Sequence, residues 1–225
     1  MIAVVGSPVG RRSKGGEVTA AGLPVAIAGA AATAGGDVQL IGKVGEGPDG
    51  DAVLLAVAAA GIGHVAVLRD IEAVTIAADE APDALSDAPI DEIAGLDGSA
   101  DGSADATPAT LAPGPALDAG DLALALRYLP DYRVVVIAQE LDAAALAAVV
   151  EAARWAGAAL VVATPGAGAT ADLPEDATVL EAPEDDDGAF AALVGRYAVA
   201  LDGGKQPAAA FAGASSGSGW SPVAD

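Results

Sequence analysis

The chain has 225 residues, of which 53% are apolar and 3% aromatic, so it is long enough for one domain with a core built from Ala, Val and Leu. It contains no cysteine, which excludes disulfide bonds, thiolate metal sites and a cysteine nucleophile. Ten Lys and Arg residues against 32 Asp and Glu residues give a net charge of −22, which argues against nucleic acid as a partner because phosphate backbones would be repelled.

Short Val-rich apolar runs alternate with longer Ala-rich segments along the chain. The runs at residues 2–5, 38–44, 64–68, 133–138 and 159–163 have the length and composition of buried strands. The segments at residues 24–34, 49–60, 118–129 and 142–156 have the periodicity of helices. Continuous apolar strands that alternate with helices are typical of a parallel sheet covered on both faces. We therefore predict an α/β fold, a three-layer α/β/α sandwich with a mostly parallel sheet.

A segment without basic residues interrupts this alternation. Between Asp70 and Leu126 there is no Lys or Arg, and the middle of this region is rich in Ala, Asp, Gly, Ser and Pro. Such a composition cannot bury enough apolar surface to offset the entropy of the chain. We predict a single domain over residues 1–225 with an acidic flexible loop or insert at residues 94–115, and a solvated loop is the simpler interpretation than a functional lid.

Two glycine motifs accompany the first predicted helix and the second predicted strand. The first reads Ala-Gly-Leu-Pro-Val-Ala at residues 21–26, and the second reads Gly-Lys-Val-Gly-Glu-Gly-Pro-Asp-Gly at residues 42–50. They resemble motifs of the ribokinase-like (PfkB-type) family of carbohydrate and nucleoside kinases, whose members read Gly-Gly-x-x-x-Asn into a helix and then Gly-x-x-Gly-x-Asp-x-x-Gly. The resemblance implies a ribokinase-like fold in which Gly22 and Gly45 are the remaining scaffold of a substrate-binding site.

The resemblance extends into the second half of the chain. Residues 117–122 and 132–157 are similar to the family's mid-domain helix, strand and helix, and residues 188–195 and 207–212 are similar to the two helices at its catalytic end. Members of the family also have a small lid sheet, and the sequence leaves open whether its strands are kept near residues 17–20 and 74–77. The connection between residues 163 and 178 is too short for the strands that hold adenine in the family, so part of the nucleotide site is expected to be missing.

The residues with which the family binds its sugar are absent. Ala26 stands at the position of the sugar-binding Asn, Gly47 stands at the position of the Asp in the second motif, and no acidic residue lies near Gly10 and Arg11, where an early Asp contacts the sugar. The chain contains no asparagine, so the family's Asn-x-x-Glu motif for magnesium and phosphate cannot be present in its usual form. Loss of one such polar group weakens discrimination by about 10⁴-fold. The resemblance therefore implies an eroded sugar site.

The family's catalytic base is an Asp at the start of a helix, in a motif similar to Gly-Ala-Gly-Asp-x-Phe, and the preceding glycine amides form an anion hole. Aligning Ala189 and Phe190 with this motif places Gly188 at the base and the aspartates of residues 185–187 at the glycines, where they would repel a phosphoryl group. A shift by one residue would instead make Asp187 the base, and this alternative stays open. In the simpler interpretation, the three aspartates cap the helix.

No other catalytic or metal-binding pattern is convincing, and we expect no metal site. His64 is the only histidine, so neither a histidine metal cluster nor a Ser-His-Asp triad is expected. The glycines of residues 42–50 lack the Gly-Lys-Ser/Thr of a phosphate loop and are expected to form a tight turn between strand and helix. The aspartates of residues 83–91 lack the spacing of a calcium loop, and the basic pair at residues 11–12 is expected to be exposed loop charge rather than an anion site.

The strong acidity, with only three lysines, has two interpretations. It fits a halophilic protein that stays soluble in a very salty cytoplasm, where counterions screen the self-repulsion. Alternatively, it forms an acidic surface for a basic partner. No stretch of about 18 residues is free of Gly, Pro and charge, and no basic region precedes an apolar one at the start, so we expect a cytoplasmic protein that has no membrane partner.

These observations favour a non-catalytic ribokinase-like protein, a pseudokinase that acts as a binding or assembly module. The expected partner is a second copy of the chain or an intact kinase relative, because family members pair through the lid sheet, and no cofactor is expected. The alternative is a diverged PfkB-type carbohydrate or nucleoside kinase that transfers phosphate from ATP, with Mg²⁺, to a hydroxyl through Asp187. A third hypothesis is a sensor that binds a sugar or nucleotide without reaction.

Overall fold

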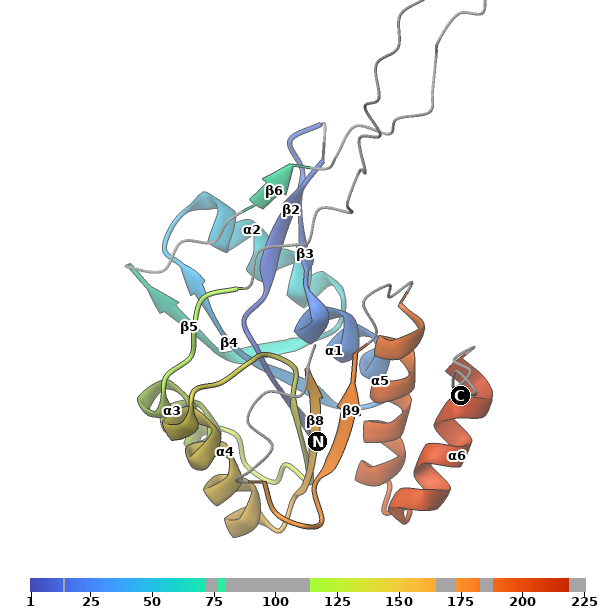
Figure 1. The fold of residues 1–225 in the computed structure, drawn as a ribbon. Helices are drawn as coiled ribbons and strands as arrows, with labels where there is room; N and C mark the ends of the chain where they lie inside the picture. Colours follow the sequence, from blue (N-terminus) through green and yellow to red (C-terminus); the bar gives the residue numbers. More distant parts are fainter. Residues whose placement is uncertain (14, 72–76, 80–113, 165–172, 183–187, 219–225) are drawn as a thin grey trace, which may run out of the picture.

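The computed structural model describes residues 1–13, 15–71, 77–79, 114–164, 173–182 and 188–218. These residues form a six-stranded sheet, a separate three-stranded sheet and six helices (Figure 1).

The large sheet has the strand order β5-β4-β1-β7-β8-β9, and every neighbouring pair is parallel. Its strands are β1 (Ile2–Val5), β4 (Val38–Gly45), β5 (Gly63–Asp70), β7 (Val134–Ile137), β8 (Ala159–Thr164) and β9 (Thr178–Glu181). The central strands β1 and β7 are apolar and buried at every position, as expected of strands with helices on both faces. Ile2 pairs with Val38 on one side and with Val134 on the other, so β1 lies at the centre of the register.

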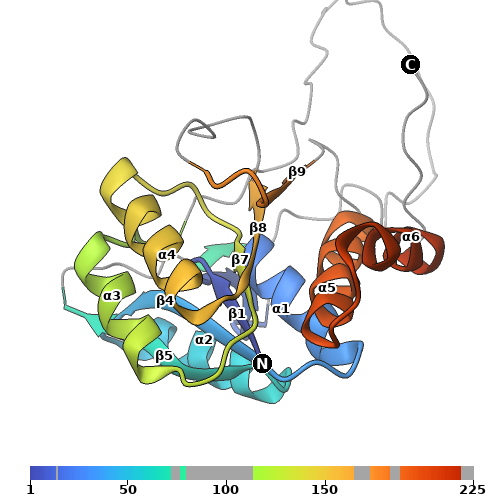
Figure 2. The ribbon, with the colours of Figure 1, turned by 90° about the horizontal axis from the view of Figure 1, so that it is seen from below.

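Helices cover both faces of this sheet. One face packs against α1 (Leu23–Thr33), α2 (Pro48–Ala59) and α5 (Ala189–Asp202), with α6 (Pro207–Ser218) against α5, and the other packs against α3 (Ala119–Tyr128) and α4 (Ala143–Ala156). Figure 2 shows α3 and α4 side by side, with α1 and α5 across the sheet. Because successive side chains of a strand point to opposite faces, Val4 joins the first core and Val5 joins the second. The predicted three-layer α/β fold is confirmed.

Helices α1 and α5 approach each other closely because small residues line their contact. A Cβ atom at Gly195 of α5 would lie 2.7 Å from the backbone nitrogen of Ala31 in α1, so any larger residue would force the helices apart. In the described part of the chain, no helix combines the length and the apolar composition needed to cross a membrane.

The small sheet stands beyond the carboxyl ends of the large sheet, next to α2 (Figure 1). Its strands are β2 (Val9–Arg12), β3 (Val18–Ala21) and β6 (Ala77–Asp79), with β2 antiparallel to β3 and parallel to β6. The question left open near residues 17–20 is answered by β3, which is a strand of the small sheet. Near residues 74–77 the structure shows only Ala77, in β6, because residues 72–76 lie outside the described ranges.

Every strand and helix predicted from periodicity is present within two residues of its predicted bounds, whereas β2 and β9 are not predicted. The prediction that the glycines of residues 42–50 form a tight turn between strand and helix is wrong for most of these glycines. Gly42 and Gly45 belong to β4 and Gly50 to α2, so only Gly47, the N-cap of α2, lies in the turn. Of the predicted acidic loop at residues 94–115, all but Gly114 and Pro115 lies outside the described residues, as do the aspartates of residues 83–91.

Candidate functional site

The strand order contains one topological switch point, the kind of place where ligands of open α/β sheets usually bind. The chain leaves β1 toward β4 on one side and leaves β7 toward β8 on the other, although β1 and β7 are neighbours. At such a switch point, the loops after the two strands diverge, and we call the place between them at the carboxyl edge of the sheet the switch-point crevice. Ser7 follows β1 and Gln139 follows β7, so these two residues mark the crevice.

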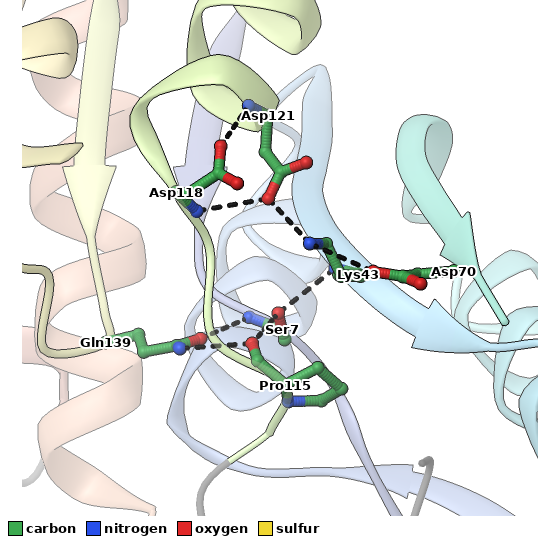
Figure 3. A network of polar contacts seen from close by, with 7 residues as sticks. All are labelled: Ser7, Lys43, Asp70, Pro115, Asp118, Asp121 and Gln139. Carbon is green, nitrogen blue, oxygen red and sulfur yellow. Dashed lines mark hydrogen bonds and ion pairs between the residues drawn. The ribbon is translucent and has the colours of Figure 1, made fainter. Parts of the chain in front are cut away.

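A backbone carbonyl from a distant part of the chain occupies this crevice. The Ser7 Oγ atom donates a hydrogen bond to the carbonyl oxygen of Pro115 at 2.6 Å, and the Gln139 Nε2 atom donates to the same oxygen at 3.3 Å (Figure 3). The Gln139 Oε1 atom accepts the backbone N–H of Ser7 at 2.7 Å, and Ser7 Oγ accepts the backbone N–H of Lys43 at 3.0 Å. The Ser7 hydroxyl and backbone N–H, and both ends of the Gln139 amide, thus have hydrogen-bond partners within the protein.

Close backbone packing fills the space around this network. A Cβ atom at Gly114 would lie 2.5 Å from the carbonyl oxygen of Ser7, and a Cβ atom at Gly42 would lie 2.9 Å from the carbonyl oxygen of Gly6. Real Cβ atoms do not approach other atoms this closely, so glycine is required at both positions. The chain segment at Gly114 and Pro115 is therefore pressed against the loop that follows β1.

A lysine from β4 links three elements beside the crevice. The Lys43 Nζ atom lies 2.7 Å from Oδ2 of Asp121 in α3 and 3.3 Å from Oδ2 of Asp70 at the end of β5, and the Lys43 side chain is only 13% exposed. The hydrogen bond to Asp121 is the main reason that the pKa of Lys43 is raised above its ordinary value of 10.5, while burial lowers it and Asp70 raises it further. The ammonium is therefore fully charged at neutral pH and neutralised by two carboxylates.

Asp121 also belongs to the N-terminal cap of α3. The Asp118 side chain accepts the backbone N–H of Asp121 at 2.8 Å, and the Asp121 side chain accepts the backbone N–H of Asp118 at 3.0 Å (Figure 3). This reciprocal capping box fixes the carboxylate that Lys43 contacts. The network consequently locks the start of α3 onto β4.

The scaffold glycines lie at the same carboxyl edge, where the sugar-binding side chains are missing. Gly22 is the N-cap of α1 with a φ of 95°, and Gly45 is the last residue of β4. Ala26 is exposed on α1 and offers no polar side-chain atom, and neither does Gly47 at the start of α2. The roles of Gly22 and Gly45 in substrate binding stay predictions, but their positions at helix and strand ends agree with a scaffold role.

The basic pair at residues 11–12 lies in strand β2 of the small sheet. The prediction that these charges lie in a loop is therefore wrong. Arg11 is exposed, whereas Arg12 contacts both carboxylate oxygens of Asp49 in the first turn of α2, at 2.7 and 2.8 Å. Arg69 of β5 pairs with Asp51, which lies in the same turn of α2. Two carboxylates at one helix N-terminus therefore connect α2 to both sheets, and Arg12 is committed to an ion pair.

The start of α5, where the catalytic motif is expected, begins at Gly188 with a φ of 92°. Gly188 occupies the N-cap, a conformation that favours glycine. Asp187 and the other aspartates of residues 185–187 lie outside the described residues, so neither the catalytic nor the capping role is tested. His64 is exposed on the edge strand β5, and among the described residues no three His, Asp or Glu side chains are grouped as metal ligands.

Comparisons with known proteins now identify the fold. Neither a protein-family model nor a curated protein matches the sequence. Among solved structures, phosphofructokinase-2 from Escherichia coli, in complex with fructose-6-phosphate, is similar with a TM-score of 0.60 at 12% identity, covering 96% of this chain and 92% of that chain. The chain has the ribokinase-like fold.

Two further sugar-kinase-like structures support this assignment of the ribokinase-like fold. A putative phosphofructokinase from Staphylococcus aureus has a TM-score of 0.59 at 13% identity, covering 95% of this chain and 89% of that chain. A PfkB protein from a Polaromonas species has a TM-score of 0.58 at 13% identity, covering 95% of this chain and 92% of that chain. The similarity thus extends over nearly the full length of the chain, and the resemblance inferred from the glycine motifs is confirmed at the level of the fold.

Sequence reasoning missed the polar network at the crevice, namely Ser7, Lys43, Asp70, Asp121 and Gln139. A signal for part of it exists, because Lys43 is the one charged residue of β4, and a lysine that is largely buried requires a carboxylate partner. The positions of Ser7 and Gln139, just after the central strands, carry a second signal once the strand order is known.

Proposed function

We propose that this chain is a non-catalytic ribokinase-like protein that acts as a binding or assembly module. The observation that carries this proposal is the Pro115 carbonyl in the switch-point crevice, where it accepts hydrogen bonds from Ser7 and Gln139. A substrate hydroxyl at this point would have to compete with a bond that the protein already makes. The polar side chains that mark the crevice are therefore used for structure rather than for a ligand.

The charges beside the crevice support the same conclusion. Lys43 is the basic side chain of this network, and Asp121 and Asp70 neutralise it, so it has no excess positive charge for a phosphate. Ala26 and Gly47 provide no side-chain group for a sugar hydroxyl. A site that stabilises a transferred phosphoryl group needs preorganised donors that are not already paired.

A second function has one observation in its favour. Asp187 immediately precedes Gly188, the N-cap of α5, which is where a base for a substrate hydroxyl would stand in this fold. In that reaction the Asp187 carboxylate takes the hydroxyl proton, the hydroxyl oxygen bonds to the γ-phosphorus of ATP bound with Mg²⁺, and the bond to the departing ADP oxygen breaks. This alternative is a diverged PfkB-type carbohydrate or nucleoside kinase.

Turnover of ATP with a panel of sugars and nucleosides separates the two functions. We expect no substrate-dependent turnover by the unaltered chain at low or at molar salt. Turnover that disappears in Asp187→Ala but persists in Asp176→Ala, which removes an exposed acidic residue elsewhere, would establish the kinase. Thermal stabilisation by a panel member without turnover would instead indicate a sensor, because a ligand that binds only the folded state stabilises it.

The charge of −22 supports adaptation to a saline cytoplasm as part of this proposal. Counterions at molar concentration reduce the Debye length to about 3 Å, so the repulsion between surface carboxylates is largely removed. Under these conditions an assembly module can approach another copy of itself or a kinase relative. At low salt the same charge keeps the chains apart.

A further inference from the structure

The two exposed aromatic side chains of the described residues lie at the ends of two neighbouring helices, at the amino edge of the large sheet. Tyr128 is in the last turn of α3 and is 71% exposed, and Trp155 is in the last turn of α4 and is 89% exposed. The other described aromatic rings are buried or partly buried. Only 3% of the residues are aromatic, and exposed Tyr and Trp side chains are enriched at protein–protein interfaces.

The topology places both helix ends at the same edge. Helix α3 leads into β7 and α4 leads into β8, and these parallel strands pair from Val134 with Ala159 onward. The Tyr132 hydroxyl, just beyond α3, donates to the carbonyl oxygen of Ala152 in α4 at 3.2 Å, so the two ends are in contact. Figure 2 shows α3 and α4 side by side in the view from below.

Four exposed charges lie on or next to the ends of α3 and α4. They are Arg127, Arg154, Asp131 and Glu151, two positive and two negative. The exposed Arg133 nearby donates to the carbonyl oxygen of Asp202 in α5 instead. The ion pairs formed within the described ranges use other basic groups, namely the amino terminus and the side chains of Arg12, Lys43 and Arg69. We call the set the α3–α4 end surface: Arg127, Tyr128, Asp131, Glu151, Arg154 and Trp155.

We propose that the α3–α4 end surface is the contact through which two copies of this chain associate. A twofold interface places the same patch on both partners, so the patch must be complementary to itself. A surface with equal numbers of both charges meets this requirement, whereas a chain with a net charge of −22 repels its own copy across most other faces. Trp, Tyr and Arg are also the residues that contribute most to binding at protein interfaces.

This inference rests on the assembly role proposed above and names its partner and its surface. It differs from pairing through the small sheet, which lies at the opposite edge of the large sheet. The charge on the rest of the surface also sets a condition: association should be stronger at high salt, where the repulsion between two acidic chains is screened.

Sedimentation of the full chain over a concentration series at molar salt tests the proposal. We expect a dimer whose dissociation constant rises by at least about 10-fold in Tyr128→Ala/Trp155→Ala, because interface aromatic residues carry much of the binding energy. Leu55→Ala, which removes a side chain that is 72% exposed on α2, is the matched control and should leave the constant unchanged. The proposal would be overturned if the chain is a monomer at every concentration, or if the double substitution leaves the dissociation constant of the dimer unchanged.

Charge reversal provides a second, independent measurement. Arg154→Glu and Glu151→Arg should each weaken the dimer, and the variant that carries both reversals should recover it, because like charges across the twofold axis are replaced by opposite ones. Failure of the double reversal to recover a dimer that each single reversal weakens would contradict a contact between Arg154 of one copy and Glu151 of the other.

Fluorescence places Trp155 at the contact directly. In a Trp220→Phe background Trp155 is the only tryptophan, and its emission should shift to shorter wavelength as the dimer forms. A dimer that leaves the emission unchanged would show that the contact lies elsewhere. Because none of these measurements involves ATP, they separate failure of this inference from failure of the non-catalytic proposal, which the turnover assay tests.

Discussion

The Nζ atom of Lys43 lies 2.7 Å from the Oδ2 atom of Asp121, so a buried strand of the central sheet is joined by an ion pair to the first turn of α3. Asp70 shares the same ammonium at 3.3 Å. Beside this pair, the Pro115 carbonyl accepts hydrogen bonds from Ser7 and Gln139 at the switch-point crevice. The stability of the α3 face and the inactivity proposed for the crevice therefore depend on one connected network.

Replacement of the lysine should expose this dependence. Lys43→Met leaves the carboxylates of Asp121 and Asp70 without their common partner, and we expect the free energy of unfolding to fall by about 2 to 3 kcal/mol. This loss of stability is smaller than the loss expected for a fully buried ion pair, because the Asp70 side chain is 34% exposed. Urea denaturation measures it, with Lys205→Met, an exposed lysine, as the control. Equal stability of the two variants would show that the ion pairs contribute nothing.

The same lysine predicts a dependence on pH in the alkaline range. Its folded-state pKa is raised above 10.5, so its contribution to stability is complete below that pH and is lost as the pH rises through the folded-state value. Burial also raises the pKa of Tyr132 above its ordinary value of 10.0. Ionisation of this tyrosine therefore also lowers the stability of the fold as the pH rises above 10.0. The unaltered chain should therefore lose more stability than Lys43→Met as the pH rises above 10.5, as urea denaturation can measure. Parallel curves for the two proteins would contradict the assignment to Lys43.

Two glycines in contacting helices should respond to the same substitution with opposite signs. Gly195→Ala introduces a methyl group that would lie 2.7 Å from the Ala31 backbone, and we expect a loss of about 1 to 3 kcal/mol. Gly29→Ala in α1 meets no atom within 4 Å and should gain up to about 1 kcal/mol, because alanine favours the helix. Thermal unfolding of both variants gives the comparison, and destabilisation by Gly29→Ala would show that the α1 surface is more crowded than described.

The bidentate contact between Arg12 and Asp49 should hold the small sheet against α2. Because the two side chains are 34% and 38% exposed, solvent screens the pair and we expect its loss to cost less than about 1 kcal/mol of global stability. Local protection is the sensitive measurement: Asp49→Asn should accelerate hydrogen exchange in β2 and β3 while β7 stays unchanged. Unaltered exchange in β2 would mean that other contacts hold the small sheet.

The net charge predicts a strong dependence of stability on salt. Raising the salt concentration from low to molar should raise the melting temperature by roughly 5 to 10 °C, because screening removes a few kcal/mol of repulsion between carboxylates. Calorimetry over a series of salt concentrations measures this effect. An unchanged melting temperature would argue against adaptation to a saline cytoplasm and favour a basic partner as the reason for the acidity.

Most of the large sheet could be predicted from the sequence because its strands are buried on both faces. A strand such as β1 consists of apolar residues only. The helices that cover the sheet begin and end at recognisable capping residues, such as Asp142 and Gly157 at the two ends of α4. Strand β9 was missed because it alternates between half-buried and exposed residues and lies at the edge of the sheet. Strand β2 was missed because it contains Gly10 and two arginines, which carry no strand signal.

The site was less predictable because it depends on contacts between distant residues. The absence of sugar-binding side chains at Ala26 and Gly47 can be read from the motifs alone. The position of the Pro115 carbonyl between Ser7 and Gln139 cannot, because these residues are brought together only by the order of the strands. For the same reason, the pairing of Arg12 with Asp49 has no local signal in the sequence.

Transfer of the labelled γ-phosphate of ATP to any of a panel of sugars and nucleosides is the decisive test of whether this chain is non-catalytic. We expect no labelled product, at low or at molar salt, from either the unaltered chain or Asp187→Ala. A labelled product that forms with the unaltered chain and is absent with Asp187→Ala would show that the chain is a kinase.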